Sequence, residues 1–242
     1  MRWVFFACVL ALVSCTASPA PPDASVKLLG KNIVLNGGTD DLLRIGFRPQ
    51  QGSALMRVDV EPVTTQVSLC PLRALDDTVR RTDCTDSVSG VREELSFPGM
   101  RAVAVVLHGS TATISFAIEY QDLERLVSLR LPGVPASPGG TACADNRCNP
   151  FFELTPTRNG AFSAGAAWSG PSSTLVLLQG RVLGRSQTAT GIPYAEVARA
   201  NGSSPLHIAT QMTSPGEYAL ALRQSGPGAG ALSRIAIDAR WP

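Results

Sequence analysis

Apolar residues recur along this chain with the period of β-strands. In residues 114–120, large apolar side chains stand at every second position between smaller or polar ones, which is the pattern of a strand with one buried face. Residues 102–107 are apolar throughout, as in a strand that is covered on both faces. Long helical periodicity is absent, apart from one uncertain helical turn within residues 72–82. We therefore expect an all-β protein.

Other short apolar segments are separated by turns rich in Gly, Pro and Asn, and each is a strand candidate. They are residues 26–29, 33–35, 43–47, 55–60, 67–69, 126–131, 151–155, 162–168, 175–178, 206–210, 218–223 and 234–239. Many short strands at regular spacing are typical of β-sandwiches. Residues 132–150 are rich in Pro and Gly and predict a linker. We expect two sandwich domains, residues 26–131 and 151–242.

The two halves can be aligned with each other. At an offset of 108 residues, Gly52 falls on Gly160 and Val60 falls on Trp168. Further along, the offset becomes 117, because the second half has a longer loop region at residues 180–202. This self-similarity predicts a tandem duplication, with a chance alignment of two β-rich segments as the alternative.

The two halves also resemble a known bacterial domain family. The resemblance is carried by DLLRIGF at residues 41–47 and VSL at residues 67–69, and by SPGEYAL at residues 214–220. These segments resemble the bacterial pre-peptidase C-terminal domain family, which implies two tandem jelly-roll-like sandwiches. Family members often carry an acidic residue before the central strand. This chain has Thr65–Gln66 and Ser173–Thr174 there, which argues against a calcium site.

The N-terminus has the features of a secretory signal. An apolar run at residues 3–13 follows Arg2 and is shorter than the roughly 20 residues that span a bilayer. Leu12-Val13-Ser14-Cys15 resembles the lipobox of bacterial lipoproteins. The resemblance implies a signal peptide at residues 1–14 and a diacylglycerol anchor with N-acylation, for example by palmitate, on Cys15. The alternatives are an ordinary signal peptide with a chance Cys, and a retained membrane helix.

The lipobox interpretation sets the compartment of the protein. Several acyl chains on one residue hold a protein firmly at a membrane. Thr16 follows the anchor, and a residue other than Asp there implies the outer membrane of the cell envelope. Residues 15–25, the lipidated Cys and a Pro-rich segment, are expected to form a tether. The net charge is only +2 and there is no basic block, so we expect no nucleic-acid partner.

Four of the six cysteines remain once the signal peptide and the lipid anchor are set aside. They are Cys70, Cys84, Cys143 and Cys148. An extracytoplasmic compartment favours disulfides, and of the three possible pairings we favour the local ones, Cys70–Cys84 and Cys143–Cys148. A zinc site is a weaker alternative, because no Cys-x-x-Cys is present and no His lies close in sequence.

Catalytic chemistry has little support in the sequence. His108 and His207 stand alone, and no nucleophile elbow, zincin motif or phosphate-binding loop occurs. Adjacent acidic residues in a strand face opposite ways, so the acidic pairs do not predict carboxylate dyads. Trp168 and Trp241 are expected in the core, with stacking on sugars as the alternative. We assign no metal, no cofactor and no catalytic residue.

These observations favour a non-catalytic protein of the bacterial cell envelope. The leading hypothesis is a lipid-anchored structural or accessory subunit that interacts with a protein partner and is attached to the membrane through Cys15. A glycan-binding surface lipoprotein is the alternative, by analogy with other sandwiches. A hydrolase whose site the sequence does not reveal is the third hypothesis.

Overall fold

The alternating segments of the sequence form strands in the computed structural model. The structure describes residues 26–35, 42–50, 52–87, 89–109, 111–121, 125–134, 151–156, 158–179, 195–213, 216–224 and 230–242. Cys15 with its lipobox, the tether, Cys143 and Cys148 lie outside the described residues, so these predictions stay predictions. One 3-10 turn, η1 (Arg81–Asp83), is the only helical segment in the described part of the chain. No helix that could cross a membrane is found among those residues. The all-β prediction is confirmed.

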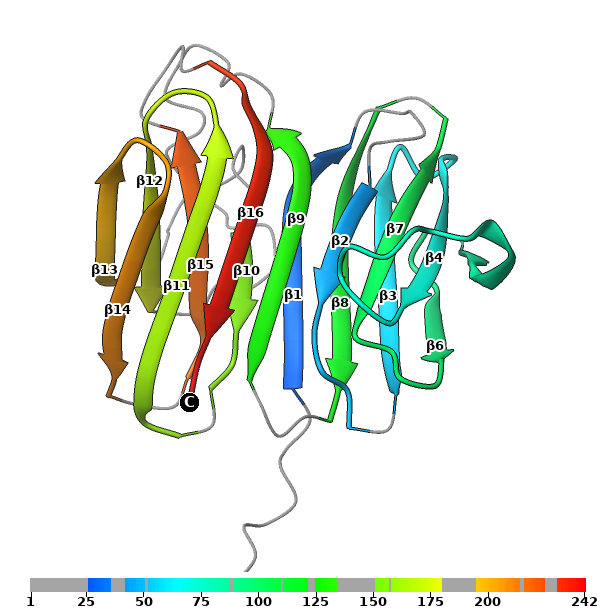
Figure 1. Cartoon of the computed structure of the whole chain (residues 1–242), viewed down its shortest axis with the longest axis horizontal. Coiled ribbons are helices and arrows are strands. Elements are labelled where there is room, and N and C mark those ends of the chain that lie inside the picture. Colours follow the sequence, from blue (N-terminus) through cyan, green and yellow to red (C-terminus); the bar gives the residue numbers. More distant parts are fainter. Residues whose placement is uncertain are drawn as a thin grey trace, which may run out of the picture.

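The strands form two antiparallel sheets that pack face to face as a sandwich (Figure 1). Sheet A has the order β13 (Ala195–Gly202), β12 (Ser173–Gln179), β15 (Tyr218–Gln224), β10 (Phe151–Leu154), β1 (Val26–Leu35), β8 (Ala112–Tyr120), β3 (Ser53–Glu61) and β6 (Arg92–Ser96). Sheet B has the order β14 (Leu206–Met212), β11 (Gly160–Ser169), β16 (Leu232–Arg240), β9 (Leu126–Val134), β2 (Leu42–Gly46), β7 (Ala102–His108), β4 (Gln66–Leu72) and β5 (Thr85–Ser87).

The order of the strands shows an internal repeat. Adding eight to each strand number of the first half, β1 to β8, gives the strand that occupies the corresponding place in the second half. The four strands β1-β8-β3-β6 of sheet A thus correspond to β9-β16-β11-β14 of sheet B. Each half contributes four strands to each sheet, as in a jelly roll. The aligned residues Val60 and Trp168 are both buried in the core, in agreement with the repeat.

The two halves share both sheets. In sheet A, β1 of the first half pairs with β10 of the second, and in sheet B, β2 pairs with β9. One hydrophobic core contains buried side chains from both halves. The sequence assigned residues 126–131 to the first domain, but β9 pairs with β16 over most of its length and takes the place that β1 takes in the first half. The division into separate domains at residues 131 and 151 stays a prediction.

Large aromatic side chains fill the interior, and both tryptophans expected there are found there. Trp168 is 6% exposed and Trp241 is 4% exposed, and the Trp168 indole donates to the Pro171 carbonyl over 2.8 Å. The rings of Phe116 and Phe152 come from different halves, and their centroids are 6.5 Å apart. The core is therefore continuous across the junction of the two halves.

The predicted Cys70–Cys84 disulfide is present and closes a cap over part of sheet B. Outer-face residues of β4 and β7 are buried there, and Leu75 and Val79 of the connection between β4 and β5 pack against them. The Arg44 guanidinium donates to the carbonyls of Leu75 and Asp77, both over 2.7 Å. We call residues 73–84 the cap.

Candidate functional site

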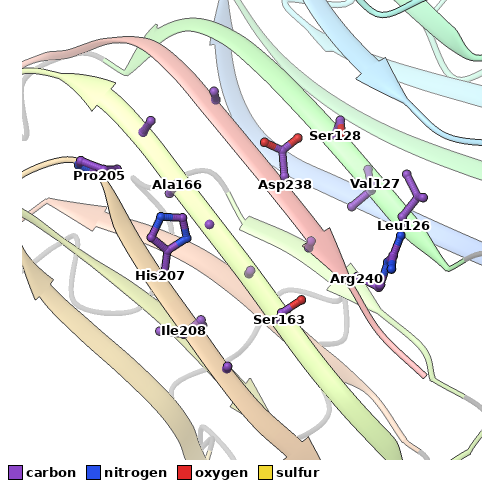
Figure 2. A pocket seen from close by; sticks show the side chains of 16 residues that line it. Leu126, Val127, Ser128, Ser163, Ala166, Pro205, His207, Ile208, Asp238 and Arg240 are labelled. Atoms are coloured by element: carbon purple, nitrogen blue, oxygen red, sulfur yellow. The ribbon is translucent and has the colours of Figure 1, made fainter.

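A groove of about 670 Å³ crosses the outer face of sheet B in the second half (Figure 2). Its floor is formed by β14, β11, β16 and β9. Every second residue of these strands points outward, and many of the outward residues are small. The small residues are Ser128, Ser163, Gly165, Ala167, Ala209 and Ala236. The hollow therefore results from the size of the side chains on a sheet of ordinary strands.

The strand register places the polar groups of the groove in one row. His207, Gly165, Asp238 and Ser128 are directly opposite one another on the four neighbouring strands. A Cβ at position 165 would lie only 2.8 Å from Nδ1 of His207, so the imidazole lies over Gly165. Figure 2 shows His207 and Asp238 on either side of β11. The row offers an imidazole, a carboxylate and a hydroxyl to a ligand in the groove.

Charged contacts fix one side of the groove. Asp238 forms an ion pair with Nη1 of Arg130 over 3.1 Å, and the two side chains come from neighbouring strands. The pair is partly exposed and contributes little to stability, and it turns the Asp238 carboxylate toward β9. Just before β9, Nη1 of Arg125 donates to the Pro242 carbonyl over 2.7 Å. The backbone N–H of Trp241 donates to the Arg125 carbonyl over 3.0 Å. These bonds tie the C-terminal residues to the start of β9.

The first half carries larger side chains at the places that correspond to the groove floor. At the offset of 108 residues, Leu55, Arg57 and Asp59 correspond to Ser163, Gly165 and Ala167. Arg57 Nη2 lies 2.8 Å from Asp59 Oδ1, and the hydrogen bond and charge of Asp59 raise the pKa of the Arg57 guanidinium.

The groove is therefore a feature of the second half and is not imposed by the fold. On the corresponding face of the first half, the described residues form a smaller hollow of about 460 Å³ near Leu55, Glu94 and Glu119.

His108 belongs to a separate polar cluster on the outer face of sheet B. The Ser68 hydroxyl donates to Asp86 over 2.6 Å and lies 2.5 Å from Nε2 of His108, so it accepts from that nitrogen. In a catalytic triad the histidine lies between the serine and the acid, whereas here the serine lies between the other two. Ser68 is also only 5% exposed. The cluster joins β5, β4 and β7 through side-chain hydrogen bonds.

The acidic pairs Asp76–Asp77 and Glu93–Glu94 do not assemble into a site, and Asp40–Asp41 lies outside the described residues. The Asp77 carboxylate accepts from the N–H of Ala74 over 2.8 Å and shapes the cap, while Asp76 is exposed beside it. Glu94 lines the small hollow of sheet A, while Glu93 lies on the other face of its strand. Among the residues that the structure describes, no group of three or more side chains could hold a metal ion.

The groove was not predicted from the sequence. The signal that could have revealed it is the run of small residues at outward positions of residues 163–167. The meaning of that run depends on small residues in three other strands, β14, β16 and β9, which local patterning does not connect.

Comparisons with known proteins identify no family for this chain. No protein-family model and no curated protein matches it. Among solved structures, the stem and receptor-binding domain of spike protein P1 from bacteriophage PM2 is similar over 92% of this chain and 98% of that chain, at 10% identity and a TM-score of 0.25. The tandem CBM22-1–CBM22-2 domain of Paenibacillus barcinonensis Xyn10C is similar over 89% of this chain and 78% of that chain, at 10% identity and a TM-score of 0.27. TM-scores of this size carry no conclusion about function.

Proposed function

We propose that this chain is a non-catalytic, lipid-anchored protein of the bacterial cell envelope that binds a partner protein through the groove on sheet B. The observation that carries the proposal is the contrast between the halves. The outward residues of β3 are Leu55, Arg57 and Asp59, whereas the corresponding residues of β11 are Ser163, Gly165 and Ala167. The small side chains leave space on this face of the second half, and that space supports a binding function.

The chemistry of the groove favours binding over catalysis. Asp238 is held by Arg130, and His207 is exposed and makes no hydrogen bond to another described residue. No nucleophile lies beside this imidazole in the part of the chain that the structure describes, since Ser163 is opposite Ala209 and Arg240. The groove therefore supplies hydrogen-bond donors and acceptors around a small-residue floor, which leaves room for a segment of a partner protein.

Glycan binding is the second candidate function. The row of polar side chains on His207, Asp238 and Ser128 would suit sugar hydroxyls. Stacking on aromatic rings would be missing in the described part of the groove, because Trp168 and Trp241 are buried in the core. We therefore rank a protein partner first.

Replacing Gly165 by arginine, the residue found at the corresponding place in the first half, is expected to block the groove. The new side chain would displace the His207 ring and fill the hollow, while the core is untouched because position 165 faces outward. Crosslinking in the native envelope followed by mass spectrometry should recover one partner at near-equal amount with the unchanged chain. Recovery with Gly165→Arg should fall about tenfold or more, as for the loss of a central contact.

The matched control is Ser96→Arg, which adds the same side chain on an exposed position of β6 and should leave recovery unchanged. Equal recovery with Gly165→Arg and the unchanged chain would show that the groove is not the binding surface. If the unchanged chain is recovered alone, the partner-protein proposal fails and a glycan array tests the second candidate.

Replacing Cys15 by alanine is expected to release the protein from membranes. Without the thiol there is no site for the diacylglycerol, and the remaining leader holds at most weakly. Membrane fractionation measures the effect, with Cys8→Ala as the control that keeps the lipobox. Retention of Cys15→Ala in the membrane fraction, with its leader uncleaved, would contradict the lipobox interpretation.

A further inference from the structure

A second pocket lies on the outer face of sheet B where the two halves meet. It is an open hollow of about 470 Å³, and three arginines from three neighbouring strands line it. They are Arg44 on β2, Arg130 on β9 and Arg234 on β16. We call it the seam pocket. None of these three residues lines the groove.

Two of the arginines are held in place with donors to spare. Arg44 and Arg130 are directly opposite each other on neighbouring strands. Nη1 of Arg44 donates to two cap carbonyls, and Nη1 of Arg130 donates to the Leu129 carbonyl over 3.0 Å and to Asp238. The Nε and Nη2 groups of both side chains make no hydrogen bond to another described residue. A guanidinium that is held through Nη1 still has the N–H groups of Nε and Nη2 free to donate. These two nitrogens can bind two oxygens of a carboxylate or phosphate at the same time.

The third arginine is held by an unusual backbone. Arg234 has φ of +52°, in the left-handed region, and it is the only non-glycine residue with positive φ in the described part of the chain. Between Ala167 and Ser169 the register of β11 with β16 shifts, so that Arg234 and Ile235 together face Trp168. Such bulges redirect a side chain, and strained residues of this kind are concentrated at functional sites.

The first half lacks the bulge. The corresponding strand β8 pairs with β3 from Leu55 to Glu61 without a register shift. Arg234 itself is exposed and has no ion pair or hydrogen bond to another described residue. The bulge therefore occurs in the second half, on the strand β16 that carries Arg234.

The fold does not require arginines where the two halves meet. On sheet A the halves meet at β1 and β10, where Leu29 lies directly opposite Glu153 and none of the paired residues is an arginine. The arginines of the seam pocket are therefore a feature of the sheet B junction. Asp76 of the cap also lines the seam pocket and has no ion pair with another described residue. Its carboxylate would repel an anion there.

We propose that the seam pocket binds an anionic oxo group, such as a phosphate, sulfate or carboxylate. Arg44 and Arg130 would form its fixed side, and Arg234 would close over it from β16. Arg130 also pairs with Asp238 of the groove, but Arg234 lines only the seam pocket, so a change at Arg234 tests this site separately from the function proposed above.

Isothermal titration calorimetry with inorganic sulfate and with inorganic phosphate tests the site. The full chain is titrated in a neutral detergent at low ionic strength. Saturable binding is expected, and Arg234→Gln should weaken it about tenfold, the effect of losing one charge-assisted contact. Asp76→Asn should strengthen binding, because it removes the repelling carboxylate. Arg92→Gln, on the exposed β6, is the matched control and should leave binding unchanged.

Three results would overturn the proposal. They are the absence of saturable binding to the unchanged chain, an equal loss in Arg234→Gln and Arg92→Gln, and no gain in Asp76→Asn when the variants unfold at the same temperature as the unchanged chain. Competition experiments identify the molecule that carries the anionic group. Acidic-lipid vesicles and a sulfated oligosaccharide are each tested for binding to the unchanged chain. Sulfate should displace the one that binds through Arg234. Arg234→Gln should leave recovery of the groove partner unchanged, so the two proposals are tested separately.

Discussion

Replacing Phe152 by alanine is expected to lower the free energy of unfolding of the whole chain by about 3–5 kcal/mol. Phe152 is fully buried on β10. In sheet A, this strand of the second half pairs with β1 of the first half. Its ring contacts that of Phe116 in the first half, with 6.5 Å between the centroids. The substitution would leave a cavity at the junction, and the surrounding strands can relax only in part because both are fixed by their neighbours.

Chemical denaturation followed by near-UV circular dichroism and by fluorescence measures this effect. Because the halves share both sheets and one core, we expect one cooperative transition that moves as a whole. Phe162→Ala serves as the matched variant, since Phe162 is 1% exposed on β11 and lies within the second half. Two transitions, of which Phe152→Ala shifts only one, would show instead that the halves are stable as separate domains.

Local patterning predicted the strands that have one clearly buried face. The alternation in residues 114–120 appears in β8 as strictly alternating buried and half-buried residues, and β7 is buried on both faces as its apolar run predicted. Residues 26–29 and 33–35, expected as two strands, form the single strand β1 with an irregularity between Gly30 and Ile33. Local sequence cannot distinguish a bulge from a turn, because both interrupt the alternation.

The strands that were missed lie at or beside the edges of the sheets. β5, β6 and β13 contain few buried residues, so their sequences show little apolar alternation. Pairing with a neighbouring strand defines them, and that neighbour lies elsewhere in the sequence. The uncertain helical turn in residues 72–82 is a cap with a 3-10 turn at its end, held by tertiary contacts of Arg44.

The arrangement of the two halves and both pockets depends on contacts between distant residues. Nothing in the local sequence of β1 or β9 indicates that each pairs across the junction. Arg44, Arg130 and Arg234 are far apart in the chain, and each alone resembles an exposed arginine of a strand. The Cys70–Cys84 disulfide, by contrast, was predictable, because an even number of cysteines in an extracytoplasmic chain favours pairing and these two are close in sequence.

Replacing both Cys70 and Cys84 by alanine is expected to destabilise the protein by about 3 kcal/mol, the chain-entropy value for a loop of this length. The two cysteines are 14 residues apart in the sequence, and the bond joins the end of β4 to the start of β5 across the cap. Without it, the buried outer-face residues of β4 and β7 would lose the packing of Leu75 and Val79 whenever the cap opens.

Denaturation under non-reducing conditions measures the loss, with Thr78→Ala in the exposed part of the cap as the control. Trypsin should also cleave the double variant faster at Arg80 and Arg81, which are exposed but held by the closed loop. Unchanged stability and unchanged cleavage would mean that side-chain packing alone holds the cap.

A loosened cap would also release the two carbonyls that orient Arg44. The same variant should therefore weaken sulfate binding at the seam pocket, although no arginine has been changed.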